Sequence, residues 1–129
     1  MTENEIGTIV VDAAIMVHSD LGPGLLESVY EVILARELAE RGLAAARQVP
    51  VAIRYRGVEF DEGFRADIIV EGKVVIELKC VEKVTRAHKK QLLTYLKLTG
   101  CRLGYLLNFA DALLMDGLTR VVNGLPEND

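Results

Sequence analysis

The stretch FRADIIVEGKVVIELKC, residues 64–80, decides how this sequence folds. Two apolar segments rich in Val and Ile flank Glu71-Gly72, a pattern typical of two β-strands joined as a hairpin, and we expect strands over residues 64–70 and 73–80. Inside these segments lie two carboxylates, Asp67 and Glu77, and the amine of Lys79. A charge inside an apolar strand is costly unless it is paired or bound, so these three are candidate site residues.

The hairpin connection decides whether the three side chains meet. Glu77 and Lys79 are two residues apart and therefore project from one face of their strand. A two-residue turn would pair Asp67 with Ile76 and turn the two carboxylates to opposite faces. A three-residue connection or a bulge reverses this, and Gly72 suits the left-handed position that such a connection needs. We therefore predict the longer connection, with both carboxylates and the amine on one face.

The rest of the chain predicts helices around these strands. Apolar residues recur at helical spacing in residues 6–17 and 25–41 and alternate in residues 49–53 and 58–60. Helical spacing returns in residues 86–98, before Gly100. The expected helices cover residues 6–17, 25–41 and 86–98, and the further strands cover 49–53, 58–60, 103–109 and 118–122. Neither a repeat nor a linker divides the 129 residues, so we expect one α/β domain over 1–129.

Composition narrows the class of protein. Half of the residues are hydrophobic, yet no apolar run approaches the roughly 18 residues that would span a membrane. The N-terminus is acidic and lacks the basic flank of a secretion signal. Cys80 and Cys101 are too few for a disulfide scaffold, so both are expected to be reduced thiols. We expect a cytoplasmic protein that does not enter membranes.

Charge is distributed unevenly along the chain. Residues 1–40 hold eight acids and the single base Arg36, whereas residues 79–102 hold seven bases and the single acid Glu82. A polyanion such as DNA would find one favourable side, although a charge run of this kind is also typical of a solvated helix face. The candidate nucleic-acid contacts are Lys83, Arg86, Lys89 and Lys90.

Four motifs together resemble a known family. GLLESVY (residues 24–30) has the GxxExxY pattern, and it is followed in order by GFRAD (63–67), IELK (76–79) and HKKQLLTYL (88–96). In this order and spacing they resemble the GxxExxY proteins of the PD-(D/E)XK nuclease superfamily, over residues 6–122. The resemblance implies a restriction-endonuclease-like fold, in which a mixed central β-sheet is flanked by α-helices.

The resemblance also implies roles for individual residues. Asp67 and Glu77 would be metal ligands, Lys79 the catalytic lysine, and Glu27 a helix carboxylate that supplements the metal site. Two carboxylates on one side suit a hard divalent cation such as Mg²⁺ or Mn²⁺. Asp67 follows Ala66 where the superfamily's name has proline, a departure that leaves the metal assignment little changed.

A further element of the resemblance lies on the third helix. Gln91 and Tyr95 match the QxxxY element that lies beside the active site in RecB-type members.

Asp67 and Lys79 also have a simpler interpretation. Without the resemblance, we would expect them to form an ordinary cross-strand ion pair on a solvated sheet face.

Three functions are compatible with the sequence. The first is a Mg²⁺-dependent nuclease that hydrolyses phosphodiester bonds, with DNA as its substrate. The second is a catalytically silent homologue that binds nucleic acid or protein. The third is an oligomeric protein, with an isologous homodimer formed through the first helix or through the apolar residues 113–115.

Overall fold

The computed structural model describes residues 1–126, except for the side chain of residue 62. Its helices are α1 (Glu3–Leu21), α2 (Glu27–Glu40) and α3 (Arg86–Thr99), with a short 3₁₀ helix, η1 (Leu114–Gly117). Its strands are β1 (Ala45–Tyr55), β2 (Val58–Val70), β3 (Val74–Lys79), β4 (Leu103–Asn108) and β5 (Leu118–Val122). Helices come first, then strands, a helix and two more strands, as the sequence predicts.

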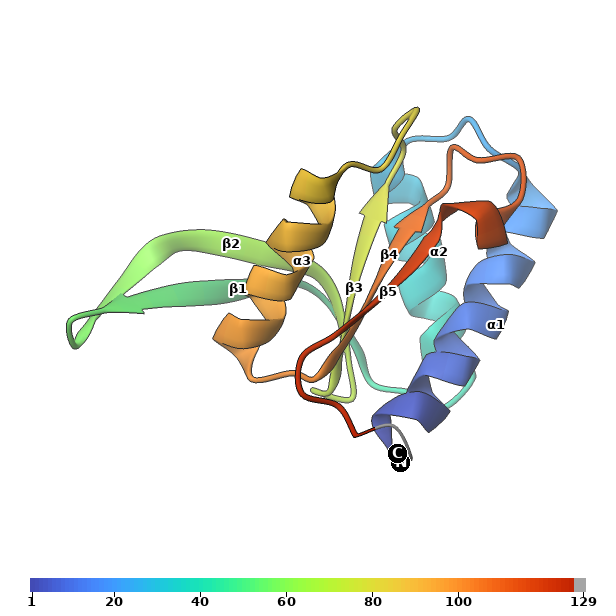
Figure 1. Ribbon diagram of the computed structural model, residues 1–129. Coiled ribbons are helices and arrows are strands. Elements are labelled where there is room, and N and C mark those ends of the chain that lie inside the picture. The colour runs from blue at the N-terminus through green and yellow to red at the C-terminus, as the bar shows by residue number, and fades with distance from the viewer. Residues whose placement is uncertain (127–129) are drawn as a thin grey trace.

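The strands form one mixed sheet in the order β1-β2-β3-β4-β5. Neighbouring strands are antiparallel except β3 and β4, which are parallel and are connected through α3. Figure 1 shows α1 and α2 on one face of the sheet and α3 on the other. The expected α/β fold, with a mixed central sheet flanked by helices, is confirmed.

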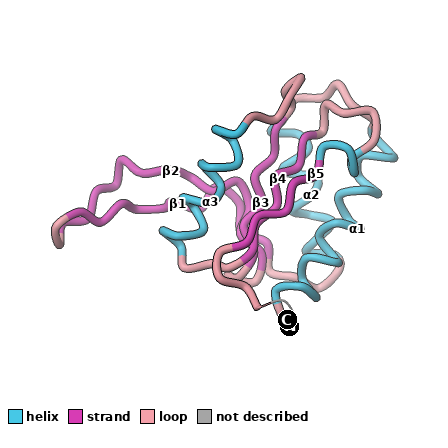
Figure 2. The backbone as a smooth tube through the Cα atoms, viewed as in Figure 1, coloured by secondary structure: helices cyan, strands magenta, loops and turns pink. Residues whose placement is uncertain are grey.

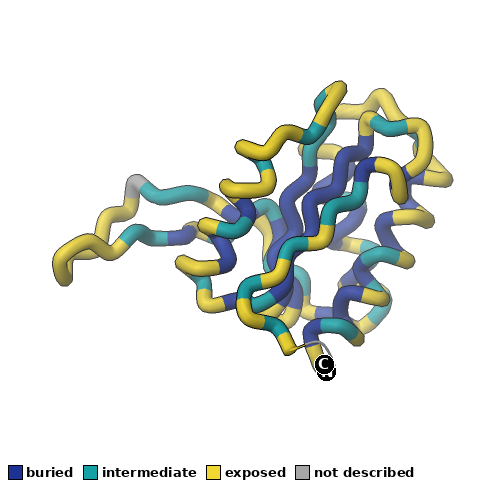
Figure 3. The backbone as a smooth tube through the Cα atoms, in the orientation of Figure 1, coloured by how far each residue is buried: buried dark blue, intermediate teal, exposed yellow. Residues whose placement is uncertain are grey.

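Each face of the sheet has its own apolar core. The central strands between the two cores are coloured as buried in Figure 3. The larger core lies under α1 and α2, where side chains such as Ile6, Tyr30 and Leu34 are fully buried against Ile76 and Leu78 of β3. The smaller core lies under α3 and contains Val75, Leu92, Leu96 and Leu106. Because residues of β3 alternate between the two cores, Glu77 and Lys79 share the α3 face with Val75.

The connection between β2 and β3 has three residues, Glu71, Gly72 and Lys73. Val70 pairs with Val74 and Ile68 with Ile76, so the next two residues along this register are Asp67 and Glu77. Gly72 adopts a left-handed backbone with φ of 64°. The predicted three-residue connection is therefore confirmed, and with it the placement of the two carboxylates beside each other.

The first hairpin is longer than the sequence predicts. Residues 58–60 and 64–70 were expected as separate strands, whereas they form the single strand β2, which pairs with β1 out to Tyr55 and Val58. The register shifts between Val51 and Ile53, and at this irregularity a Cβ on Gly63 would lie 2.0 Å from the backbone oxygen of Val51. Glycine thus lets the strands stay paired through a bulge. The hairpin projects well beyond the rest of the sheet (Figures 1 and 2).

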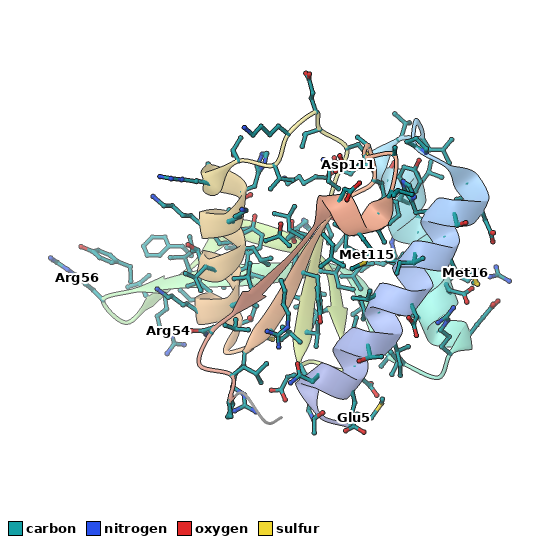
Figure 4. The ribbon with its side chains drawn as sticks, turned by 45° about the vertical axis from the view of Figure 1, so that its right-hand side comes forward. Glu5, Met16, Arg54, Arg56, Asp111 and Met115 are labelled. Carbon is teal, nitrogen blue, oxygen red and sulfur yellow. The ribbon has the colours of Figure 1, made fainter. Side chains whose placement is uncertain are left out.

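Two further expectations are corrected at the ends of α1. The helix begins at Glu3 because Thr2 and Glu5 form a capping box ahead of the first apolar residue. It also continues past residue 17, where the sequence predicts its end, to Leu21. His18 lies buried in the last turn, with its Nε2 2.8 Å from the backbone oxygen of Asp111. Asp111 and Met115 lie beside α1 (Figure 4). In the described residues, no helix is long and apolar enough to cross a membrane.

We predict that Gly72→Ala lowers the free energy of unfolding by about 1 kcal/mol, because a side chain disfavours the left-handed backbone at this position. Urea denaturation measures the change. Lys73→Ala, in the same loop but without a positive φ, is the control and is expected to stay within about 0.5 kcal/mol of the wild type. Equal effects of the two substitutions would show that the backbone conformation of Gly72 does not matter.

Candidate active site

Asp67 and Glu77 lie where β2 and β3 separate. Beyond the pair Ile68 and Ile76, the regular pairing between these two strands ends, and hydrogen bonds from the backbone to side chains take its place. The backbone N–H of Asp67 donates to Glu77 Oε1 at 3.0 Å, and the backbone N–H of Leu78 donates to Asp67 Oδ2 at 2.9 Å. The two carboxylates are thus fixed to each other's strands by reciprocal hydrogen bonds.

The surroundings of both carboxylates disfavour their charged forms. Burial, with an addition from the negative charge of Asp67, raises the pKa of Glu77 to about 8, although the nearby Lys79 acts in the opposite direction. Burial also raises the pKa of Asp67 to about 6, with additions from the charges of Glu31 and Glu27 and opposition from the Leu78 hydrogen bond. The site is therefore short of positive charge.

Lys79 ends β3 at the mouth of this site. It is half-buried, and its register partner on β4 is Asn108. The Asn108 side chain is 1% exposed and binds both the N–H and the carbonyl of Val81, while Phe109 donates its backbone N–H to the Lys79 carbonyl. Asn108 thereby fixes the chain directly after Lys79. A lone Asn at the end of an apolar strand gave no sequence signal for this role.

Helix α2 brings a second acid that sequence reasoning missed. Glu31 is 5% exposed, and its Oε2 accepts hydrogen bonds from Nε and Nη2 of Arg47 at 3.0 and 2.8 Å. Its Oε1 accepts from the side-chain amide of Gln48 at 2.7 Å. The predicted residue Glu27, one turn earlier, is exposed, although its charge still acts on Asp67. Spacing at i and i+4 could have indicated both acids, but not which of them is buried.

Gln48 has a strained backbone beside the site. Its φ is +52°, a backbone conformation that residues other than Gly rarely adopt. In β1 its neighbours Arg47 and Val49 pair with Ile68 and Ala66, which places Gln48 opposite Asp67. Strain of this kind persists where the surrounding structure enforces it, and here the bond to Glu31 does so.

The tyrosine of the GxxExxY segment, Tyr30, has a structural role. Tyr30 is fully buried, stacks on Phe109 with ring centroids 4.5 Å apart, and donates its hydroxyl hydrogen to the carbonyl of Gly22. The same hydroxyl accepts the backbone N–H of Leu25 at 3.1 Å. Tyr30 therefore holds the loop that leads into α2, and so fixes where Glu27 begins the helix.

The two predicted residues of α3 differ in their environment. Tyr95 is buried against Phe64, with ring centroids 4.3 Å apart, and its pKa is raised to about 12 by burial and by the charges of Glu77 and Asp67. The Tyr95 hydroxyl is therefore close enough to interact electrostatically with both carboxylates. Gln91 lies one turn earlier on the same helix and is exposed.

The four predicted nucleic-acid contacts lie before and on the first turns of α3. Lys83, Arg86, Lys89 and Lys90 are all exposed, and none of them enters an ion pair with another described residue. By contrast, Arg47 and Arg102 are held by the buried acids Glu31 and Glu3. The bases at the start of α3 are therefore available to a polyanion.

The fold and these carboxylates define a class of protein, and comparison with known proteins identifies the same class. The family model of the PD-(D/E)XK nuclease superfamily matches residues 4–121. No curated protein and no solved structure matches the chain significantly. The chain belongs to the PD-(D/E)XK nuclease superfamily, a class that acts on nucleic acids and typically uses divalent metal ions.

The residues present fit such an ion. Two adjacent carboxylates whose pKa values are both raised by burial and by neighbouring negative charge would gain from a cation between them. Among residues 1–126, no three His, Cys, Asp or Glu side chains form a ready-made metal cluster. The pair would therefore hold an ion together with water or substrate oxygens, which is how Mg²⁺ is commonly bound.

We predict that in metal-free buffer Glu77→Gln stabilises the protein at pH 8. A carboxyl with a raised folded-state pKa keeps a proton that the unfolded chain releases, so stability falls as the pH rises from the ordinary value of 4.5 to about 8. The substitution removes this loss, and the gain at pH 8 should exceed about 1.4 kcal/mol, the equivalent of one pKa unit.

Urea denaturation in EDTA at pH 5 and pH 8 measures this difference. Glu59→Gln, at an exposed position of the first hairpin, is the control and should show no comparable gain. A Glu77→Gln protein no more stable than the wild type at pH 8 would contradict the burial of a charged carboxylate at this position.

Proposed function

We propose that this protein is a metal-dependent nuclease that hydrolyses phosphodiester bonds of DNA, and that within its superfamily it is a GxxExxY protein. The observation that carries the proposal is the meeting of Asp67, Glu77 and Lys79 where β2 and β3 separate, in a chain that matches the superfamily over most of its length. The finer placement is supported by the sequence of residues 24–30 and by the buried Tyr30 that ends this motif.

The proposed reaction needs few protein groups. Asp67 and Glu77 would hold Mg²⁺ or Mn²⁺, and the ion would stabilise charge on the phosphate and lower the pKa of a bound water. Lys79, whose charge already acts on Glu77, would orient the attacking water and stabilise negative charge on the phosphate oxygens. The hydrogen bond from the Leu78 N–H keeps Asp67 turned toward β3 for this task.

The neighbouring residues would serve this pair in different ways. Glu27 is exposed and so can turn toward an ion, directly or through water. Glu31 has its oxygens bound by Arg47 and Gln48, so we assign it to positioning Asp67 instead of to metal binding. Tyr95 would orient Lys79 or the substrate phosphate, and Gln91 would contact the substrate from the exposed surface of α3.

The substrate would approach along the start of α3. Lys83, Arg86, Lys89 and Lys90 offer four unpaired positive charges there, and phosphate contacts of this kind supply affinity without reading sequence. This arrangement suits a nuclease whose preference comes from the shape of its substrate.

We predict that Asp67→Asn and Lys79→Met each lower the rate of Mg²⁺-dependent cleavage by about a hundredfold or more. The first removes the charge of a carboxylate that would hold the ion, and the second removes the positive charge that would stabilise the phosphate. A fluorescently labelled oligonucleotide, tested as single strand, duplex and RNA, measures the rate. Asp12→Asn and Lys73→Met, which change the same residue types at exposed positions, are matched controls and should keep the wild-type rate.

The outcomes separate the candidate functions. Cleavage by Asp67→Asn at the wild-type rate would contradict the proposed mechanism. A wild-type protein that binds DNA but neither binds Mn²⁺ by calorimetry nor cleaves would instead be the silent homologue. Exposed Leu113 and Met115 could support a homodimer, and a dimer mass that is lost in Leu113→Ala/Met115→Ala would identify that interface.

A further inference from the structure

At the end of the β1–β2 hairpin, every residue from Arg54 to Phe60 is exposed. We call residues 53–60 the arm. Its turn is tight, since Tyr55 pairs with Val58 and the two residues between them, Arg56 and Gly57, have φ of 50° and 78°. Two successive positive φ values are typical of the hairpin turn that matches strand twist, so the two strands stay paired up to the turn. It extends past α3, away from the helices on the other face (Figures 1 and 3).

One face of the arm is apolar and uncovered. Directly paired residues share a face, and the last pairs are Ile53 with Phe60 and Tyr55 with Val58. Tyr55, Val58 and Phe60 are 59%, 55% and 43% exposed. Among the described residues, neither apolar core includes any of these four side chains. Exposed aromatic residues gathered on one surface indicate a binding function.

The tip of the arm is also basic. The sequence from Arg54 to Val58 has two arginines and no acid, and both arginines are exposed. The Arg56 guanidinium lies over the Tyr55 ring, 5.2 Å from its centroid. In Figure 4, Arg56 marks the far end of the arm and Arg54 lies nearer to α3. The acid Glu59 faces Arg54 across the ribbon, and two more acids, Asp61 and Glu62, follow in the sequence of β2.

Building on the nuclease function above, we propose that the arm binds a single-stranded part of the nucleic-acid substrate. Bases would stack on Tyr55 and Phe60, and Arg56, whose guanidinium lies over the Tyr55 ring, would contact a phosphate. Exposed aromatic side chains beside a positive charge suit unpaired bases, because every base offers a π-face for stacking. In a duplex those faces are covered by neighbouring bases.

The position of the arm connects it to the candidate active site. β2 runs without interruption from Val58 at the tip to Asp67 in the site, a length of about 30 Å at the usual rise per residue. The basic start of α3 lies on the same face of the sheet as Glu77 and Lys79. A strand bound at the arm is therefore aligned with the place where cleavage is proposed.

We predict that Tyr55→Ala/Phe60→Ala binds a single-stranded oligonucleotide at least about tenfold more weakly than the wild type, since stacking on one aromatic residue contributes roughly that factor or more. Fluorescence anisotropy in EDTA measures the dissociation constant without cleavage. Val32→Ala/Val122→Ala removes two apolar side chains outside the arm, 46% and 44% exposed, and should bind like the wild type. Duplex affinity should change much less than single-strand affinity.

A second measurement reports contact directly. The protein has no tryptophan, so Tyr55→Trp places a single fluorophore on the arm. Stacking by an unpaired base should quench its emission on titration with single-stranded DNA. Leu113→Trp is the matched control and should not respond.

The outcomes distinguish this proposal from the proposed function. Suppose that the wild type binds and cleaves, while Tyr55→Ala/Phe60→Ala keeps the wild-type affinity and Tyr55→Trp shows no quenching. This result would overturn the proposal for the arm and leave the proposed function in place. If Asp67→Asn loses cleavage and only Tyr55→Ala/Phe60→Ala binds tenfold more weakly, the results support both the proposed nuclease function and the proposal for the arm. A dimer mass that falls to monomer in the arm variant, with DNA affinity unchanged, would show that a second copy of the chain occupies the arm and would overturn the proposal.

Discussion

The two hydrogen bonds that tie the Asp67 and Glu77 carboxylates to each other's strands, from the Asp67 N–H to Glu77 and from the Leu78 N–H to Asp67, are the interactions on which the site depends. They form because β2 and β3 part after Ile68 and Ile76, so that two backbone N–H groups lose their ladder partners and take carboxylate oxygens instead. The same bonds orient both acids. A connection one residue shorter would move Asp67 to the other face, and neither bond could form.

The helices then supply two different environments to this point of the sheet. Helix α2, held at its start by Tyr30, adds the negative charges of Glu27 and Glu31, which disfavour the charged form of Asp67. Helix α3 covers the opposite face with Leu92, Tyr95 and Leu96 and opens with exposed bases. An acidic interior beside a basic surface is the arrangement in which a cation can bind within the site while a polyanion lies across it.

Local pattern was enough to predict most of the fold. The spacing of apolar residues and the position of Gly and Pro located the three α-helices and the strands, although β2 was expected as two strands and η1 was not expected. Gly72 decided the hairpin parity, because this signal depends on neighbours within a few residues. The bulge at Gly63 escaped prediction, since its cause is the approach of Val51 from another strand. Asn108, Gln48 and the burial of Glu31 escaped for the same reason: each depends on a contact between segments far apart in sequence.

Three features of this molecule reduce its stability, and all lie along β2 or directly beside it. Two carboxylates are buried together, Gln48 holds a left-handed backbone opposite one of them, and aromatic side chains remain exposed on the arm. These costs follow one strand from its tip to the site, and both proposals place a single ligand along that strand. A nucleic acid with its divalent ion would relieve the charge repulsion at Asp67 and Glu77 and cover the exposed rings, which is why the same strand carries both proposals.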